Sequence, residues 1–477
     1  MAESLKNKAV KGTVWSSLER FSVQGIQFVI MIVMARILTP ADYGLVGMLA
    51  IFIAIAQSLI DSGFSQALIR KQDRRQTDND TVFYFNIGVG IILYLILFLT
   101  APLIAAFYAE PQLTLLTRII CLGIIINSLT VVQRAIYTIN IDFKTQAKAT
   151  LIGAIASGAT GITMAYTGFG VWSIVAQQIT NLAVSSAMLW TFSSWRPTRT
   201  FSAASFREMF TFGSKLALSG ILDTIYRNIY LIVIGKMFRA SDLGYYTRAH
   251  QFADFPSTTL TGIIQRVTFP VLCTIQDDDQ RLASAYRRIL RVSAFVIFPL
   301  MTGLSALATP FVLTILNPTW AYAATLLSIL CFAMMWYPIH AVNLNLLQVK
   351  GRSDLLLRLE IYKKIIGIAI LCITIPMGLT AMCVGLIISS LLALIINTHY
   401  TGRLIHVGFL RQMRDLIPTL LYTLSMWAIV TILINYITPT WLQLLAGTIA
   451  GATYYLLITT LTRSRDLREL IAILHRR

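Results

Sequence analysis

The sequence predicts an all-α polytopic membrane protein with about fourteen transmembrane helices and both termini in the cytoplasm. The first observation is its composition, with a mean hydropathy of +0.70, 56% hydrophobic residues and only 13% charged residues. Soluble domains of this length are far more polar. The second is the recurrence of apolar segments long enough to cross about 30 Å of hydrocarbon. The third is the distribution of Lys and Arg between these segments.

Basic residues occur almost entirely in alternate gaps between the apolar segments. The basic gaps hold 32 of the 39 Lys and Arg residues. Cytoplasmic loops retain such residues, so these gaps are predicted to be cytoplasmic, and the number of spans is even. The net charge of +18 is therefore expected from topology. It predicts contact with anionic membrane lipids and no nucleic acid partner. The basic gaps lie at 6–11, 70–75, 134–148, 196–215, 266–291, 350–364, 403–414 and 463–477.

The apolar segments predict the spans one by one. Each must satisfy its own backbone in lipid, and the segments are too long for barrel strands, so they are predicted to be helices. No remaining gap could hold a soluble catalytic domain. The N-terminal segment is interpreted as an uncleaved signal anchor, and the five cysteines have no paired spacing. No cofactor is predicted. The spans lie near 12–36, 41–62, 80–106, 112–136, 148–167, 169–192, 208–237, 242–265, 283–307, 319–347, 355–377, 379–401, 415–436 and 439–462.

The chain contains an internal duplication at an offset of 200 residues. The segment 30–44 aligns with 230–244, and both copies end one span with a base and start the next with a polar cap. Convergence of short outer turns on similar capping residues is the alternative. The duplication predicts two parallel six-helix bundles around a central cavity, which is a transporter architecture. The predicted divisions are a bundle at 1–192, a cytoplasmic linker at 193–207, a second bundle at 208–402, and two additional helices with a basic tail at 403–477.

Polar residues inside the spans are the candidates for a substrate site, because polar groups are costly in hydrocarbon. They concentrate in spans 1, 2, 7 and 8, the first pair of each repeat. Residues 17, 20, 24 and 27 form one helical stripe in span 1, and residues 219, 223 and 227 form another in span 7. The candidate cavity residues are Arg20, Gln24, Gln27, Gln57, Asp61, Asp223, Arg227, Arg248, His250 and Asp254.

Structural explanations compete with this prediction. Arg20 could extend to the inner headgroups or pair with Glu19, and Arg227 could pair with Asp223 inside span 7. His250 and Asp254 could relay a proton or only hydrogen-bond between helices. The acidic runs 78–80 and 277–279 resemble a metal-binding pattern, but each precedes a helix and is interpreted as N-capping. The sequence contains no phosphate loop or catalytic triad, and the protein is predicted not to be an enzyme.

Several motifs resemble those of a known family. They are Lys8–Trp15, Ala35–Gly44, Asp61–Arg70, Gly235–Lys236, Asp242–Ala249, Phe269–Leu272 and Lys350–Asp354. On these motifs the chain resembles the polysaccharide transporter branch, with Wzx-type and colanic acid exporters, of the multidrug/oligosaccharidyl-lipid/polysaccharide exporter superfamily. The resemblance implies two bundles facing a cavity lined by spans 1, 2, 7 and 8. It also implies a flippase that moves an undecaprenyl-pyrophosphate oligosaccharide across the bacterial inner membrane by alternating access.

The implied substrate gives the cavity residues roles. Arg20, Arg227 and Arg248 would hold the pyrophosphate by charge-assisted hydrogen bonds, and the Gln and Ser residues would contact sugar hydroxyls. A glycan polymerase and other assembly proteins are expected partners. The alternatives are a cation-coupled drug exporter and a flippase for lipid-linked peptidoglycan precursors. From other classes, a membrane glycan polymerase would need a large external loop, and a structural scaffold would not need intramembrane arginines.

Overall fold

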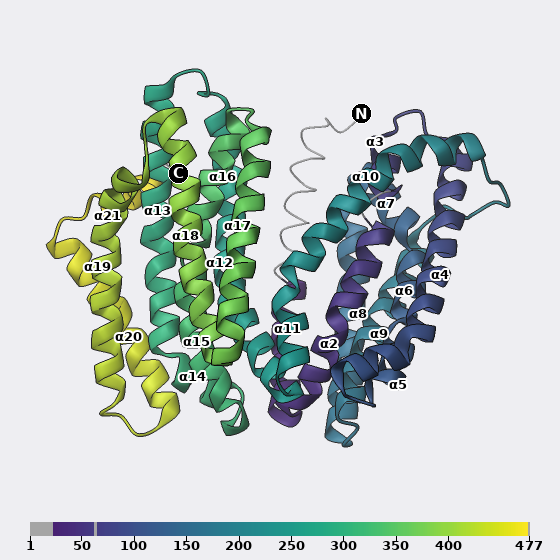
Figure 1. Ribbon diagram of the computed structural model, residues 1–477, viewed down its shortest axis with the longest axis horizontal. Helices are drawn as coiled ribbons and strands as arrows, with labels where there is room; N and C mark the ends of the chain where they lie inside the picture. The colour runs from purple at the N-terminus through teal and green to yellow at the C-terminus, as the bar shows by residue number, and fades with distance from the viewer. Residues whose placement is uncertain (1–21, 62–63, 476–477) are drawn as a thin grey trace. The chain divides into compact units, whose positions relative to one another are not determined.

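A computed structural model describes residues 22–61 and 64–475, and every regular element within them is a helix (Figure 1). The chain forms two compact units, residues 1–244 and 245–477. Unit 1 contains the helix Ser22–Ile37, α2 (Pro40–Asp61), α3 (Phe64–Arg70), α4 (Gln76–Tyr108), α5 (Leu113–Ile120), α6 (Leu122–Ser128), α7 (Val131–Ile139), α8 (Phe143–Tyr166), α9 (Val171–Phe192), α10 (Ala203–Arg227) and α11 (Ile229–Met237).

Helix α12 (Ala240–Cys273) begins in unit 1 and continues into unit 2. Unit 2 further contains two short 3₁₀ helices, Pro318–Trp320 and Ile375–Met377. Its remaining helices are α13 (Asp279–Ala306), α14 (Ala308–Ile315), α15 (Ala321–Met334), α16 (Tyr337–Val349), α17 (Ser353–Thr374), α18 (Leu379–Ile405), α19 (Phe409–Ile434), α20 (Thr440–Leu461) and α21 (Arg465–His475).

The described helices include many that are suited to a bilayer. Eight helical runs among the described residues are long and apolar enough to cross a membrane, and ten if each of two bent pairs counts as one span. The protein is therefore a multi-pass membrane protein. The segments expected as spans 6, 8 and 11 are helical (α9, α12 and α17) but more polar, and α12 carries Arg248, His250 and Asp254. The total of fourteen spans stays a prediction.

Helix starts follow the capping residues of the sequence. At α2, the backbone N–H of Thr39 donates to Asp42 Oδ2 at 2.9 Å, and the N–H of Asp42 donates back to Thr39 Oγ1 at 3.4 Å. This reciprocal pattern satisfies donors that a helix N-terminus leaves unpaired. Asp278 caps α13 by accepting the Arg281 N–H at 3.0 Å, and Asp78 accepts the Arg75 N–H at 2.9 Å. The interpretation of both acidic runs as N-terminal capping signals is thus confirmed at these two residues.

In unit 1, contacts gather the basic gaps at one end. Lys71 Nζ donates to Glu208 Oε2 at 2.9 Å, and Gln76 Nε2 donates to the Arg196 carbonyl at 2.8 Å. The gap after α3 therefore lies beside the segment before α10. At the other end, Lys236 Nζ donates to the Phe107 carbonyl and lies 4.8 Å from the centre of the Phe107 ring. Unit 1 thus has a basic end and an opposite end where the base-poor gaps meet.

Unit 2 has the same two kinds of end. Ion pairs join its basic gaps, because Lys350 Nζ lies 2.6 Å from Asp279 Oδ1 and Arg287 Nε lies 2.6 Å from Asp415 Oδ2. At the opposite end, the Tyr322 hydroxyl lies 3.0 Å from Thr380 Oγ1 and links the base-poor gaps before α15 and α18. In Figure 1, α14 and the turn between α19 and α20 lie at this end of the unit, which is the lower one.

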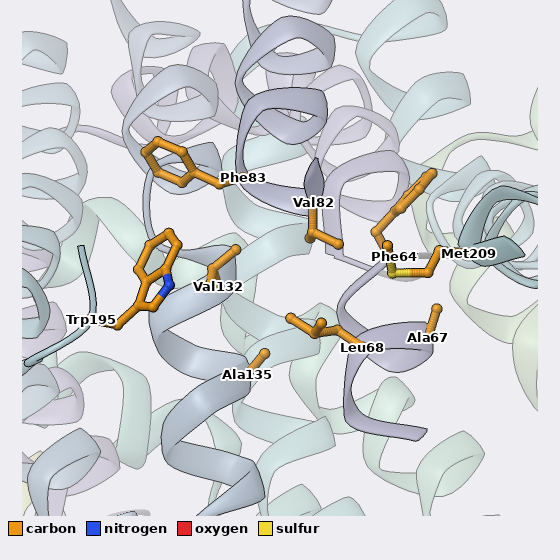
Figure 2. Close-up of a cluster of buried hydrophobic side chains, with 9 residues drawn as sticks. All are labelled: Phe64, Ala67, Leu68, Val82, Phe83, Val132, Ala135, Trp195 and Met209. Atoms are coloured by element: carbon orange, nitrogen blue, oxygen red, sulfur yellow. The ribbon is translucent and has the colours of Figure 1, made fainter. Parts of the chain in front are cut away.

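The core of unit 1 at its basic end is a cluster of apolar side chains that includes the linker between α9 and α10. Figure 2 shows Trp195 of the linker beside Phe83 of α4, and the two rings lie 5.5 Å apart between centroids. Trp195 is 9% exposed, and its Nε1–H donates to Gln76 Oε1 at 3.0 Å. Burial of an aromatic ring with its polar atom paired is strongly favourable. The cluster consists of Phe64, Ala67, Leu68, Val82, Phe83, Val132, Ala135, Trp195 and Met209.

A buried carboxylate holds the rest of the linker. Asp80 of α4 is 0% exposed and accepts hydrogen bonds from the Thr198 N–H at 3.2 Å, the Thr198 hydroxyl, the Thr200 hydroxyl at 2.7 Å and Gln76 Nε2 at 3.2 Å. Hydrogen bonds to a charged acceptor contribute more than neutral ones. The linker is therefore fixed to unit 1 along its length, and α10 starts at a defined place.

Buried amides and hydroxyls join three helices of unit 2. Gln412 Nε2 of α19 donates to Thr401 Oγ1 of α18 at 3.0 Å and to Asn343 Oδ1 of α16 at 3.2 Å. All three residues are at most 1% exposed. In a bilayer such bonds contribute roughly 0.6 kcal/mol each, because the polar groups also find partners before the helices associate. The sequence does not predict this network, because isolated Asn, Thr and Gln residues carry no spacing signal.

The two copies of the duplicated turn touch each other reciprocally inside unit 1. A Cβ built on Gly44 would lie 1.7 Å from the Ala240 carbonyl oxygen, and a Cβ built on Gly244 would lie 1.8 Å from the Pro40 carbonyl oxygen. At the offset of 200 residues, Gly44 corresponds to Gly244 and Pro40 to Ala240. Only glycine permits such a close backbone approach. Equivalent residues of the two copies thus make equivalent contacts, as a local two-fold relation requires.

Candidate functional site

Two bent helix pairs lie among the described residues of unit 1, and one of them, in the span expected at 208–237, carries candidate site residues. The sequence predicts a single span over 208–237, but α10 ends at Arg227 and α11 begins at Ile229, with a bend of 45° between residues 217–227 and 229–237. Asn228 occupies the break, and its Nδ2 donates to the Thr224 carbonyl at 2.8 Å. Broken helices at membrane depth are tolerated where protein or water covers them, and transporters commonly place their sites there.

A charged pair lies in the last turn of α10, directly before this break. Arg227 Nε lies 2.7 Å from Asp223 Oδ2, and the two side chains are 77% and 50% exposed. The pairing expected as one alternative for Arg227 is therefore present. A guanidinium has five N–H donors in a planar arrangement, and one carboxylate accepts at most a bidentate pair of them. The cation also lies at a helix C-terminus, where the macrodipole favours positive charge.

The exposure of Asp223 and Arg227 indicates which environment this face of α10 meets. A charged side chain at the centre of a bilayer costs about 2.5–3.5 kcal/mol even on the mildest scale. In acyl chains the two charges attract each other strongly, but the cost of removing both from water can exceed that gain. Contact with lipid acyl chains would therefore be unfavourable for Asp223 and Arg227. The pair is explained if this face of α10 borders water or a polar ligand.

Of the other candidates in unit 1, Gln57 lies on a helix that packs against the broken span. Helices α10 and α11 pack against α2, which carries the half-buried Gln57. In the helix Ser22–Ile37, Gln24 is half-buried and Gln27 is exposed. Arg20 lies outside the described residues, and Asp61 is the last residue of α2, without a described side chain. Spans 2 and 7 are thus adjacent, as the cavity prediction requires.

The remaining candidates belong to α12 and to unit 2. Arg248 Nη1 donates to Gln251 Oε1 at 2.6 Å, and the ring of His250 lies 5.7 Å from that of Tyr246. Thr258 Oγ1 lies 3.4 Å from Asp254 Oδ2. A shared site for these residues and for Arg227 stays a prediction, as does the proton relay. Among the described residues, no three His, Cys, Asp or Glu side chains are grouped as a metal site would need.

The sequence predicts the charged pair but not the break at Asn228. The i, i+4 spacing of Asp223 and Arg227 was visible as a stripe of polar residues. The break has no Pro or Gly at its centre, and a single Asn within an apolar run is a weak signal for the end of a helix. The side chain and the backbone N–H of Asn228 both donate to the Thr224 carbonyl, and only the folded backbone reveals the bend.

The fold, with its many long apolar helices, defines a multi-pass membrane protein. The family described as "Polysaccharide biosynthesis protein" matches residues 33–325, more than half of the chain, and the protein belongs to that family. The expected resemblance to the polysaccharide transporter branch of the exporter superfamily is confirmed.

Two relatives illustrate the match. The lipopolysaccharide biosynthesis protein WzxC of Escherichia coli is 27% identical over 403 residues, which cover 83% of this chain and 80% of WzxC. The succinoglycan biosynthesis transport protein ExoT of Rhizobium meliloti is 25% identical over 477 residues, covering 99% and 97% of the two chains.

Solved structures share the fold. The lipid II flippase MurJ in an inward closed conformation aligns with a TM-score of 0.78 at 14% identity, covering 96% of this chain and 100% of MurJ. An inward-facing multidrug resistance transporter of the MATE family aligns with a TM-score of 0.62 at 16% identity, covering 80% and 95%. At these identities the likeness is one of fold alone. The all-helical membrane fold expected from the sequence is thereby confirmed.

Proposed function

We propose that the protein is a flippase that moves a lipid-linked oligosaccharide across the bacterial cytoplasmic membrane for surface polysaccharide assembly. The family membership carries this proposal, and relatives named for lipopolysaccharide biosynthesis and succinoglycan transport support it. The substrate is an oligosaccharide joined through pyrophosphate to undecaprenol. The step is movement without covalent chemistry, so the protein is not an enzyme. Two parallel six-helix bundles, with α19 and α20 added, would alternate between inward and outward openings.

The proposed topology follows the positive-inside rule. The basic end of each unit faces the cytoplasm, together with both termini and the linker, and contacts anionic lipid headgroups. The base-poor ends face outward. Arg227 at the broken span then lies well inside the membrane, beyond the reach of the inner headgroups. A glycan polymerase that receives the product outside is the expected functional partner.

Arg227 is the residue proposed to hold the pyrophosphate. Its guanidinium can fork to phosphate oxygens, and a hydrogen bond to a charged group contributes about 1.5–3 kcal/mol. Since about 1.4 kcal/mol corresponds to a factor of ten, replacing Arg227 by Ala is expected to lower export about tenfold or more. Arg227→Lys keeps the charge and loses the planar pair of donors, so its export should lie between those of the wild type and Arg227→Ala.

The test is surface glycan in a strain whose own flippase gene is deleted, normalised to protein in the membrane. Arg403→Ala is the control, because Arg403 is an exposed arginine at the end of α18. Asp223→Asn separates the roles of the pair. If Arg227 binds the substrate, Asp223→Asn retains export while Arg227→Ala loses it. An equal loss of export in Asp223→Asn and Arg227→Ala would indicate that the ion pair only stabilises the helix. Full export by Arg227→Ala at normal protein levels would refute the proposal.

A further inference from the structure

Unit 2 contains a polar cavity far along the chain from the charged pair. Its volume is about 440 Å³, within the range of about 300–1,000 Å³ that small-molecule sites occupy. Residues from α13, α14, α15, α19 and the start of α20 line it, together with Asn435. It lies at the base-poor end, where the turn between α19 and α20 approaches the junction of α13 and α14. Under the proposed topology this end faces outward.

The inner wall of the cavity is held by hydrogen bonds. Ser305 Oγ donates to the Ser328 carbonyl at 2.9 Å and also lies 2.9 Å from Ser328 Oγ. The Trp427 indole N–H donates to Ser305 Oγ at 3.3 Å, and its ring lies 6.0 Å from the Phe332 ring. Ser305 is only 4% exposed. Two hydroxyls and an indole from α13, α15 and α19 are therefore fixed in place before any ligand enters.

The mouth of the cavity has hydrogen-bonding side chains as well. Thr309, Thr325 and Asn435 line it and are exposed. Hydroxyl and amide groups supply both donors and acceptors. In a membrane protein, polar groups persist where they face a cavity or a partner, because acyl chains cannot satisfy them. Water or a ligand that forms hydrogen bonds suits a cavity with this lining.

The uncharged lining of the cavity favours a neutral ligand. Every described residue that lines the cavity is uncharged. A phosphate or an ammonium group would lose hydration there without a counter-charge, which is strongly unfavourable. A neutral molecule with several hydroxyls would instead find donors, acceptors and an aromatic wall. A sugar ring has these properties, with hydroxyls at its rim and C–H groups on its faces.

We propose that this cavity binds a neutral sugar residue of the transported glycan at the outward end of unit 2. The inference rests on the proposed function, which supplies the glycan. It also gives α19 and α20 a role, because these helices lie outside the two expected bundles and close one side of the cavity. The sugar would be held there apart from the pyrophosphate.

The test uses the full chain in phosphatidylcholine nanodiscs, without sugar-based detergent. Glucose, galactose and N-acetylglucosamine are titrated, and binding is followed by saturation-transfer difference NMR. Glucose 1-phosphate and phosphoethanolamine serve as charged probes. We expect saturable binding of at least one neutral sugar and weaker binding of both charged probes.

The variant Thr325→Val/Asn435→Leu removes two exposed polar groups at the mouth and keeps similar side-chain sizes. Loss of two neutral hydrogen bonds of typical strength corresponds to an affinity about thirtyfold weaker. Thr448→Val is the matched control, since Thr448 is exposed on α20, is not among the cavity's lining residues and donates to its own helix at the Leu444 carbonyl. Unfolding temperatures establish that the variants fold.

Unchanged sugar binding in the double variant would overturn the proposal, as would no saturable binding of any neutral sugar. Tighter binding of phosphoethanolamine or glucose 1-phosphate would also overturn it and make the cavity a headgroup site. These outcomes are independent of export. Normal glycan export together with absent sugar binding refutes the cavity assignment alone, whereas failed export in the flippase-deletion strain refutes the proposed function.

Discussion

The reciprocal contact between the duplicated turns predicts a sharp effect of one methyl group. Replacing Gly44 by Ala puts a Cβ 1.7 Å from the Ala240 carbonyl oxygen, whereas real Cβ atoms essentially never approach closer than 3.0 Å. The backbones of α2 and α12 must therefore separate by more than 1 Å. The obstructing atoms belong to the backbone, so no side-chain rotation can relieve the contact.

The size of the effect follows from two opposing terms. Overpacking of a tight interior costs about 1–3 kcal/mol and occasionally more. Gly to Ala within a helix by itself gains about 0.5–1 kcal/mol. Because the clash involves backbone, we expect Gly44→Ala to lose about 2 kcal/mol net, which corresponds to a fall in unfolding temperature of roughly 4–8 °C for a unit of this size. Gly244→Ala should behave alike, since its Cβ would lie 1.8 Å from the Pro40 carbonyl oxygen.

The assay is thermal unfolding of the full chain in nanodiscs, followed by circular dichroism. Gly88→Ala is the matched control. Gly88 lies within α4, and a Cβ there would have no described heavy atom within 4 Å, so this variant should unfold at or slightly above the wild-type temperature. If Gly44→Ala and Gly88→Ala unfold at the same temperature, the two turns are not in backbone contact and the reasoning fails.

Three further predictions concern the basic ends of the units. Asp80→Asn should weaken the linker attachment by about 1.5–3 kcal/mol, seen as faster limited proteolysis within 193–202, while Asp73→Asn, an exposed acid nearby, should not. Arg291→Met leaves Asp466 and Glu469 of α21 without their buried guanidinium at 3.0 Å, so hydrogen exchange over 465–475 should accelerate, unlike in Arg281→Met. The hydrogen bond to Glu208 raises the pKa of Lys71 above 10.5. The stability that this bond adds is therefore complete below about pH 10.5 and is lost only as the pH rises through the folded pKa. The unfolding temperatures of wild type and Glu208→Gln should differ by a constant amount from pH 6 to 9 and converge as the pH passes the folded pKa of Lys71.

The attachment of the linker bears on how the two halves could move. Thr198, Thr200 and Trp195 are bound to α3, α4 and α7 through Asp80 and the apolar cluster of Figure 2. A flexible connection between repeats would leave α10 free to shift against unit 1. Here the start of α10 is fixed, and the span changes direction at Asn228, between α10 and α11.

The sequence alone determined the membrane fold, the duplicated turn and the caps at Thr39, Asp78 and Asp278. These depend on hydropathy, charge and short-range hydrogen bonds, which act within a few residues and leave a pattern in the chain. The pairing of Asp223 with Arg227 was visible for the same reason, because four residues on a helix are neighbours in space.

The tertiary structure alone decided which distant groups meet. Asp80 was interpreted only as part of a capping run, yet its carboxylate binds a linker more than a hundred residues away. The break at Asn228, the backbone contact of Gly44 with Ala240 and the polar cavity around Ser305 likewise carry no local signal. Each depends on long-range packing, where the free energy comes from groups that the sequence separates and only folding brings together.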